Sequence, residues 1–323
     1  MEKRNIRAKL CIVLILLCSI SIGGCSKSKE TSLDLVKEYI KEKNYPKAIR
    51  ELRDITEYKN AEALKKEVRD IIEAPYLSCN YTYVAAINKS RGVNAILGDY
   101  GFVTNTTEWQ DILYLDKDES SEMNFCAVAN DGRIFTVAED CMPNDIRLKL
   151  KLGSNSNIEK MITDSYFNGN IGLKTDGTVV YQCENLSKQE QDVMNQWTEV
   201  VDIETGLQVY ALTADGKVLP SDLKSPIASE LSSWSDIIAI SASLDTVVGL
   251  KQDGTVVVAS ENQYGSNNVS SWSDIVAIDT CGYFTIGLKS DGTLVTTEYQ
   301  NDGLEIAKAA ELSNLYVPSI AID

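Results

Sequence analysis

The fold is decided by Trp234-Ser235-Asp236-Ile237-Ile238-Ala239-Ile240 and by the following Gly249-Leu250-Lys251-Gln252-Asp253-Gly254-Thr255-Val256-Val257, because the chain repeats both. The pattern returns as Trp272-Ser273-Asp274-Ile275-Val276-Ala277-Ile278 and Gly287-Leu288-Lys289-Ser290-Asp291-Gly292-Thr293-Leu294-Val295. Further copies of the second half begin at Gly172 and Ala211, and Asn130-Asp131-Gly132 marks a fifth. Gly98-Asp99-Tyr100-Gly101 is the candidate for a degraded sixth.

The spacing of these copies is regular. The aspartates of the Asp-Gly pairs step by 45, 39, 38 and 38 residues, at Asp131, Asp176, Asp215, Asp253 and Asp291. Trp197, Trp234 and Trp272 step by 37 and 38, and Trp109 lies 88 residues before Trp197. A fixed period near forty residues indicates a repeat architecture in which every unit packs on its neighbours.

Each unit is predicted to be a small antiparallel sheet. Asp-Gly favours a two-residue hairpin turn whose central residues both have φ > 0, and runs such as Thr-Val-Val favour strands. The tryptophan supplies a large area to bury between neighbouring sheets. One unit cannot shield its own faces, whereas radial repetition can. We therefore predict an all-β main domain, a β-propeller of six to seven blades with repeats of about 38 residues, whose structural positions are Trp109, Trp197, Trp234, Trp272, Gly132, Gly177, Gly216, Gly254 and Gly292.

The pattern W-[ST]-[DE]-[IV]-[VI]-x-I followed by G-L-K-x-D-G-T-V-V resembles the regulator-of-chromosome-condensation repeat in its short bacterial form. Asn262-Gln263-Tyr264-Gly265-Ser266 also resembles that family's N-x-x-G-Q loop. The resemblance covers roughly residues 80–300 and implies a propeller, usually seven-bladed. It leaves open whether residues 76–90 or the C-terminal tail close the ring. The family's frequent histidine is replaced by Gln208, Thr246 and Phe284.

The first residues read as an export signal. Basic residues from Lys3 to Lys9 precede an apolar run over 10–22 that is too short to span a bilayer as a helix. Ile22-Gly23-Gly24-Cys25 resembles the lipobox of bacterial lipoproteins, which implies an acylated Cys25. We expect residues 1–25 to be a lipoprotein signal peptide, and the mature chain to be lipid-anchored on the outer face of the bacterial cytoplasmic membrane.

Residues 26–75 are predicted to be a tether and a short helical segment. Apolar residues recur one turn apart over 31–74, which indicates three short helices. Thr31 and Asp34 have the spacing of a capping box. Asn44-Tyr45-Pro46-Lys47-Ala48-Ile49 resembles the start of one tetratricopeptide unit. The segment is then either a stalk packed on the propeller or a second docking surface, and residues 76–323 form the propeller.

Charge and composition exclude several classes of function. The chain carries −16 overall, and residues 75–323, with fifteen Lys/Arg against thirty-five Asp/Glu, carry −20. Such a surface repels phosphate backbones, so we predict no nucleic-acid partner. The absence of histidine from the sequence removes Ser-His-Asp and Cys-His catalysis and most zinc hydrolase sites. We expect no enzyme activity, no metal and no cofactor, and we interpret the acidic loop 116–122 as solvated rather than calcium-binding.

Five cysteines remain after the lipobox: Cys79, Cys126, Cys141, Cys183 and Cys281. Their odd number and their spacing, which includes no C-x-x-C, argue against a disulfide framework. We interpret most of them as small core residues. One pair could bridge, and the sequence leaves open which.

Binding functions remain. We favour a monomeric, non-catalytic module that binds an extracellular protein through propeller loops, with Tyr181, Asn262, Tyr264 and Tyr299 as candidate contact residues. The alternative is a cell-wall carbohydrate binder, which requires clustered exposed aromatic residues in one groove. A carboxylate-based hydrolase is the third hypothesis, and it requires convergent carboxylates with raised pKa values.

Overall fold

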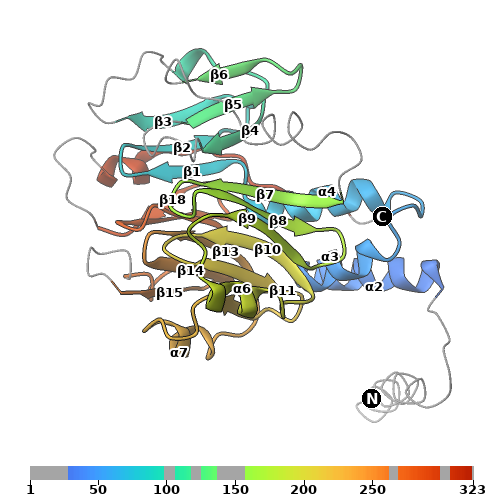
Figure 1. Ribbon diagram of the computed structural model, residues 1–323. Helices are drawn as coiled ribbons and strands as arrows, with labels where there is room; N and C mark the ends of the chain where they lie inside the picture. The colour runs from blue at the N-terminus through green and yellow to red at the C-terminus, as the bar shows by residue number, and fades with distance from the viewer. Residues whose placement is uncertain are drawn as a thin grey trace, which may run out of the picture.

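A computed structural model of the chain describes residues 28–97, 106–117, 125–136, 157–261, 268–298 and 306–321. In these ranges the chain forms six three-stranded antiparallel sheets preceded by three helices (Figure 1). The predicted all-β propeller with an N-terminal helical segment is confirmed.

The six sheets follow one another along the chain, and each is a simple meander. The strands are β1 (Leu77–Asn80), β2 (Tyr83–Ile87), β3 (Val93–Leu97), β4 (Ile112–Lys117), β5 (Phe125–Ala129), β6 (Ile134–Thr136), β7 (Ile158–Asp164), β8 (Gly169–Lys174), β9 (Val179–Cys183), β10 (Val200–Thr205), β11 (Val209–Thr213), β12 (Val218–Pro220), β13 (Ile237–Ser243), β14 (Thr246–Lys251), β15 (Val256–Ser260), β16 (Ile275–Thr280), β17 (Thr285–Lys289) and β18 (Leu294–Thr296).

Helices stand before the first sheet and between later ones. The N-terminal segment comprises α2 (Lys29–Lys41), α3 (Tyr45–Arg53) and α4 (Ala61–Glu73). The N-cap of α2 is Ser28, whose hydroxyl accepts a hydrogen bond from the Thr31 amide at 3.2 Å, so the predicted capping role of Thr31 is wrong. Helical turns also precede Trp109, Trp197 and Trp234, as η1 (Thr106–Glu108), α6 (Lys188–Met194) and α7 (Ala228–Leu231), and η2 (Ile306–Glu311) follows the last sheet.

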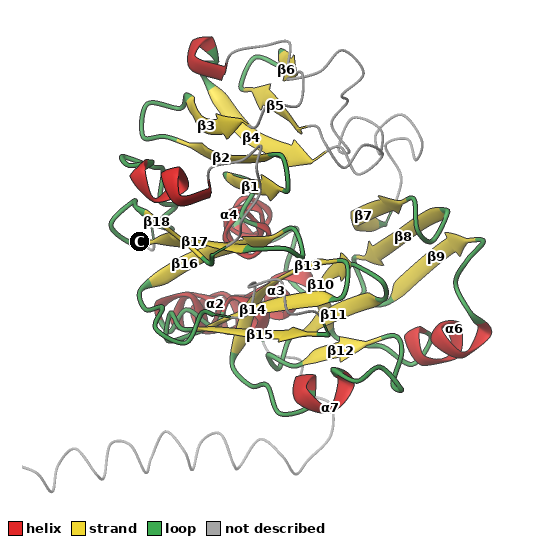
Figure 2. Cartoon of the chain, turned by 90° about the vertical axis from the view of Figure 1, so that its left-hand side faces the viewer, coloured by secondary structure: helices red, strands yellow, loops and turns green. Residues whose placement is uncertain are grey.

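The six sheets surround a common axis. The first strand of each sheet contacts the first strand of the next along β7, β10, β13, β16, β1 and β4. Figure 2 looks along this axis with the sheets spread around it, and α4 is seen near the middle because it lies at the end of the ring where Figure 1 places the helices. The first strands are therefore the inner ones, and the first and last sheets of the chain are neighbours.

The Asp-Gly hairpins are three-residue loops, not the two-residue turns that the sequence suggested. In one of them Lys174 pairs with Thr178, and the Gly177 amide donates to the Lys174 carbonyl at 2.9 Å. Gly177 has φ +78°, whereas Asp176 is absent from the described residues with positive φ. The aspartate instead accepts from the Thr178 amide at 2.9 Å. A type I turn with a left-handed glycine therefore joins the second and third strands.

The repeated tryptophans are buried against repeated glycines. A Cβ added to Gly249 on β14 would lie 2.8 Å from Cζ3 of Trp234, and one added to Gly287 on β17 would lie 2.9 Å from Cζ3 of Trp272. Both tryptophans are at most 8% exposed. The Gly-Leu-Lys part of the repeat thus leaves room for the indole ring of the same unit.

The first sheet is completed by the C-terminal segment of the chain, which closes the ring. Leu315 forms an isolated bridge with Asn88 beside β2, and the Tyr316 amide donates to the Ile87 carbonyl at 2.8 Å. In the regular units, the first residue of the inner strand pairs in the same way with the last residue of the second strand, as Ile237 does with Lys251. The C-terminal segment and β1 therefore share the inner position of the first sheet.

The first sheet contains a sixth hairpin of the repeat type, at a different place in the sequence from the one expected. Its second and third strands are joined by residues 88–92, where Arg91 has φ 61° at the position that glycine holds in the other hairpins. The Ile112 amide donates to the Arg91 carbonyl at 2.8 Å, as the Ile275 amide does to Gly254. In the first sheet the hairpin equivalent to the Asp-Gly turns is therefore at residues 88–92, and the degraded copy expected at 98–101 lies outside the described residues.

Candidate functional site

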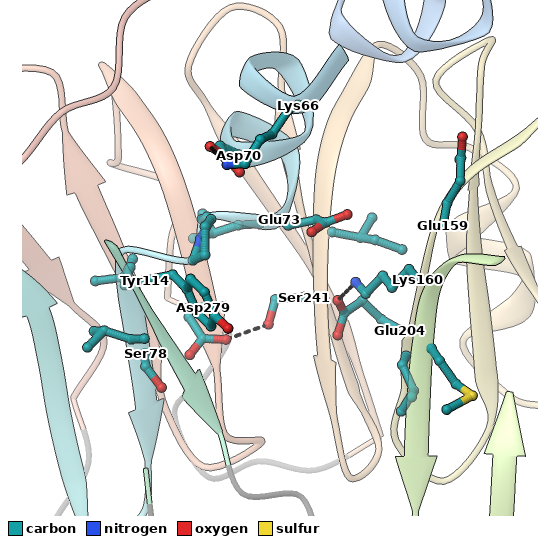
Figure 3. A pocket seen from close by; sticks show the side chains of 18 of the residues that line it. Lys66, Asp70, Glu73, Ser78, Tyr114, Glu159, Lys160, Glu204, Ser241 and Asp279 are labelled. Atoms are coloured by element: carbon teal, nitrogen blue, oxygen red, sulfur yellow. Dashed lines mark hydrogen bonds and ion pairs between the residues drawn. The ribbon is translucent and has the colours of Figure 1, made fainter. Parts of the chain in front are cut away.

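The inner strands line an open cavity of about 380 Å³ on the propeller axis. Residues from β1, β4, β7, β10, β13 and β16 line it, and the C-terminal end of α4 lies against it through Asp70, Glu73 and Ala74 (Figure 3). A volume of this size is in the range of small-molecule pockets. Because α4 occupies one side of the axis, the helical segment is an integral wall of this cavity.

A buried carboxylate holds the helices on the ring. Glu159 of β7 forms ion pairs with Arg53 of α3 at 2.6 Å, with Lys65 of α4 at 2.5 Å and with Arg69 of α4. Burial alone would raise the pKa of Glu159, but Arg53 and Arg69 outweigh it and lower that pKa to about 2. Only 4% of the Glu159 side chain is exposed, so these three cations, and not water, stabilise its negative charge.

The next residue of β7 carries a second ion cluster. The Lys160 ammonium lies 2.8 Å from Asp202 and 2.7 Å from Glu204, both on β10. Burial raises the pKa of Asp202 to about 7, although Lys160 opposes the shift. Asp202 is not among the described residues that line the cavity. This cluster therefore ties β7 to β10, and it places Lys160 and Glu204 on the cavity wall.

A third polar group joins three inner strands. The Ser241 hydroxyl of β13 donates to Asp279 Oδ1 of β16 at 2.9 Å (Figure 3), and the Cys79 amide of β1 donates to Asp279 Oδ2 at 2.6 Å. The Thr280 amide completes the group by donating to the Ser241 hydroxyl at 3.1 Å. The sheets on either side of the closure are thus tied together at the cavity wall.

One end of the propeller is covered by the helices. In a three-stranded meander, the two hairpins lie at opposite ends of the sheet. Asp-Gly hairpins of the third to fifth sheets face the helical segment: Arg50 pairs with Asp215 at 3.8 Å, and the Gln252 side-chain Nε2 donates to the Glu42 carbonyl. A Cβ added to Gly177 would lie 2.8 Å from Arg53. The Asp-Gly end of these sheets is therefore not an open surface.

The opposite end carries apolar residues in the turns between the first and second strands of five sheets, which we call the turn face: Tyr81, Tyr166, Leu207, Leu244 and Tyr283. The rings of Tyr81 and Tyr283 meet edge to face at 6.3 Å. The Leu207 amide donates to the Leu244 carbonyl at 2.6 Å, and a Cβ on Gly282 would touch the Leu244 side chain at 2.9 Å. Leu207 is 47% exposed and Tyr166 56% exposed. Turns from neighbouring sheets thus present apolar side chains beside one another.

The predicted contact residues are only partly located. Tyr181 is not a loop residue: it lies half-buried on β9, and its hydroxyl donates to Asn195 Oδ1 at 3.2 Å. Asn262, Tyr264 and Tyr299 lie outside the described residues, as does Cys25. Asn262 and Tyr264 follow β15, whose last residues pair with the start of β14 and so end at the turn face.

The repeat residues occupy equivalent places. All four tryptophans are buried. The five glycines have φ between 70° and 86°, and they are Gly132, Gly177, Gly216, Gly254 and Gly292. These residues shape the sheets and their packing; none lines the cavity in the described part of the chain.

No protein-family model matches the chain, and no curated protein is similar to it in sequence. Similar solved structures include the ectodomain of the receptor kinase CR4 from Physcomitrella patens, with 12% identity, a TM-score of 0.40, and coverage of 71% of this chain and 65% of that one. They also include Prp20p from Saccharomyces cerevisiae, the yeast RCC1, with 12% identity, a TM-score of 0.36, and coverage of 68% and 70%. The computationally designed Ika8 protein is 16% identical, with a TM-score of 0.38 and coverage of 71% and 84%.

The chain spans 65% of the CR4 structure that it matches. The similarities concern the fold alone, and the propeller assignment rests on the sheets described above. Within the described ranges, no group of three or more Cys, Asp or Glu side chains is placed to hold a metal ion. None of the described helices combines the length and the apolar composition needed to cross a bilayer.

Proposed function

We propose that this chain is a non-catalytic binding module that is held on the outer face of the bacterial cytoplasmic membrane and binds a protein partner with the turn face of its propeller. The observation that carries the proposal is the contrast between the two ends of the ring. The Asp-Gly hairpins of the third, fourth and fifth sheets face the helices, whereas the turn face presents partly exposed tyrosine and leucine side chains. Aromatic residues are enriched in protein interfaces.

The anchor part of the proposal rests on the sequence. A basic start, a short apolar run and the lipobox-like Ile22-Gly23-Gly24-Cys25 favour acylation of Cys25. The helical segment begins within a few residues of that cysteine, at Lys29. In this arrangement the helix-covered end of the ring is tethered, and the turn face is available to a partner.

The charge of the chain suggests the chemistry of that partner. Residues 75–323 carry a net −20, from fifteen basic and thirty-five acidic side chains. A basic surface around the apolar contact would be attracted at long range, and its association would slow as salt increases. We therefore expect a partner whose contact surface has an apolar centre and a basic rim.

A matched pair of variants tests this function. Leu207→Asp places a charge on the turn face, and Ile134→Asp places one beside an Asp-Gly hairpin, where Ile134 is 39% exposed compared with 47% for Leu207. The experiment is a pull-down from a native cell-envelope extract with each full chain. We expect one stoichiometric protein with the wild type and with Ile134→Asp, and a loss of at least about tenfold in affinity with Leu207→Asp.

Equal recovery by both variants would contradict the assignment of the turn face. Retention of the chain on purified wall polymer, with no protein recovered, would favour carbohydrate binding instead. The axial cavity gives that alternative less support, because Tyr114 is the only aromatic residue among the described residues that line it. The hydrolase hypothesis is also less favoured: the raised pKa belongs to Asp202, which is buried and paired with Lys160.

A further inference from the structure

Two cysteines meet where the ring closes. Cys79 lies on β1 of the first sheet, and Cys281 directly follows β16 of the last sheet. They are 1% and 6% exposed and belong to the same apolar core. The hydrogen bond from the Cys79 amide to Asp279 at 2.6 Å fixes β1 against β16 two residues before Cys281. The closure therefore brings together residues that are 281 − 79 = 202 positions apart in the chain.

Both thiols lie in this core, and the Cys281 Sγ lies 3.9 Å from the Phe284 carbonyl oxygen. Burial alone would raise the pKa of Cys281, but its hydrogen bonds with Cys79 and with backbone groups of Phe284 and Tyr283 lower that pKa below its ordinary value. A lower pKa increases the thiolate fraction, which is the form that attacks disulfides. The other described cysteines lie in different sheets, Cys126 on β5 and Cys183 on β9.

We propose that Cys79 and Cys281 form a disulfide that closes the propeller ring covalently. The bond forms by exchange with a disulfide-bearing thiol oxidoreductase. One thiolate attacks the oxidant to give a mixed disulfide, and the second thiolate displaces the reduced oxidant. The two cysteine thiols lose two protons and two electrons in total, and the disulfide of the oxidant becomes a dithiol. Because both thiols are buried, the exchange takes place while the seam between the first and last sheets is open.

The bond would act mainly on the unfolded chain. A cross-link between residues so far apart removes much of the freedom of the unfolded state, and this effect grows with the length of the closed loop. It would also prevent the first and last sheets from separating. Without the bond, only hydrogen bonds and packing hold these two sheets together. This disulfide depends only on the contact between the first and last sheets, and not on which face binds a partner.

The test starts from the reduced full chain, which is incubated with oxidised glutathione, blocked with an alkylating reagent in denaturant and digested. We expect a peptide linking Cys79 to Cys281, 2 Da lighter than the sum of the reduced peptides. We also expect a midpoint of thermal unfolding about 10 °C higher than that of the reduced chain. Cys281→Ser should abolish this reductant-dependent shift, and the matched control Cys183→Ser should retain it.

The proposal is overturned if both cysteines are fully alkylated after oxidation, or if either one is linked to a different cysteine. The peptide map of the wild-type chain decides this even if Cys281→Ser does not fold. The same map made from the chain isolated from bacterial envelopes reports whether the bond forms after export. Failure of the turn face to bind a protein would leave the map unchanged, so the two proposals fail separately.

Discussion

The last regular units and the closing seam build the same backbone from different side chains. In the unit that begins at Trp272, Asp274 has φ 61° and the Ile275 amide donates to the Gly254 carbonyl at 3.0 Å. In the seam, Asn314 has φ 58° and the Leu315 amide donates to the Gly292 carbonyl at 3.2 Å. Leu312 stands where Trp272 stands, three residues before the inner strand.

The difference shows which features of the repeat are needed to pass from one sheet to the next. The left-handed residue and the amide contact to the preceding hairpin are present in both places, because they carry the chain from one sheet to the next. The indole ring is dispensable in the seam, where the first sheet supplies apolar contacts of its own through Tyr76 and Ile87. Arg91, which replaces the hairpin glycine there, lies 4.0 Å from the ring centroid of Tyr316. This cation–π contact offsets part of the cost of its left-handed backbone.

The largest expected effect separates the two regions directly. Trp272→Ala removes a buried indole from a regular unit and should lower the free energy of unfolding by about 3–5 kcal/mol. Leu312→Ala removes a smaller, half-buried side chain from the seam and should cost about 1 kcal/mol. Denaturant titration of both variants measures the difference. Equal losses would mean that the seam relies on Leu312 as heavily as a regular unit relies on its tryptophan.

The next effect concerns the helical segment, which is attached to the propeller by ion pairs with Glu159. Glu159→Gln leaves Arg53, Lys65 and Arg69 without their buried carboxylate, and it should cost about 3 kcal/mol at pH 7. The control is Asp70→Asn on the same helix, which breaks the exposed pair with Lys66 and should change stability by less than about 0.5 kcal/mol. Similar losses for both variants would show that the Glu159 cluster does not hold α4 on the ring.

The same carboxylate predicts a pH dependence. The folded-state pKa of Glu159 is about 2, below its ordinary value of 4.5. Its contribution is therefore fully present above pH 4.5 and is lost as the pH falls toward 2. Stability measured across that window should fall less steeply for Glu159→Gln than for the wild type. Parallel curves for the two proteins would contradict the assigned shift.

The smallest effect tests the hairpin glycines. Gly254 has φ +83°, and its added Cβ would be in ordinary van der Waals contact, so Gly254→Ala should cost about 1–2 kcal/mol through backbone strain alone. Arg91 already adopts a left-handed backbone, so Arg91→Ala should cost only the cation–π contact, about 0.5–1 kcal/mol. Thermal unfolding of both variants compares the two hairpins. A larger loss for Arg91→Ala would reverse this ranking.

The regular units could be predicted from the sequence because their spacing and turn chemistry are repeated in Trp234, Gly254 and their counterparts. The closure could not be predicted, because Leu312, Asn314 and Arg91 keep the backbone without keeping the residue types. The hairpin type was also mistaken, since Asp-Gly suits both two-residue and three-residue loops and only the φ values distinguish them.

The candidate site was harder to predict than the fold. The axial cavity depends on α4, and the Glu159 cluster joins residues that are about a hundred positions apart, so no local pattern reports either. The turn face had a weak signal: Leu207, Leu244 and Tyr283 each lie between the first and second strands of a unit. Tyr181 was expected in a loop after an Asp-Gly hairpin, but it lies within the third strand of its sheet.

Amide hydrogen exchange at the seam tests most directly whether the two chain ends close the ring. The amides of Leu315 and Tyr316 donate to carbonyls of the last and first sheets, at 3.2 Å and 2.8 Å. We expect their exchange to be slowed to within about tenfold of the Ile275 amide, because opening the seam requires both sheets to separate. Exchange of both amides at the rate of an unstructured peptide, with Ile275 still protected, would show that the ring does not close through its C-terminal segment.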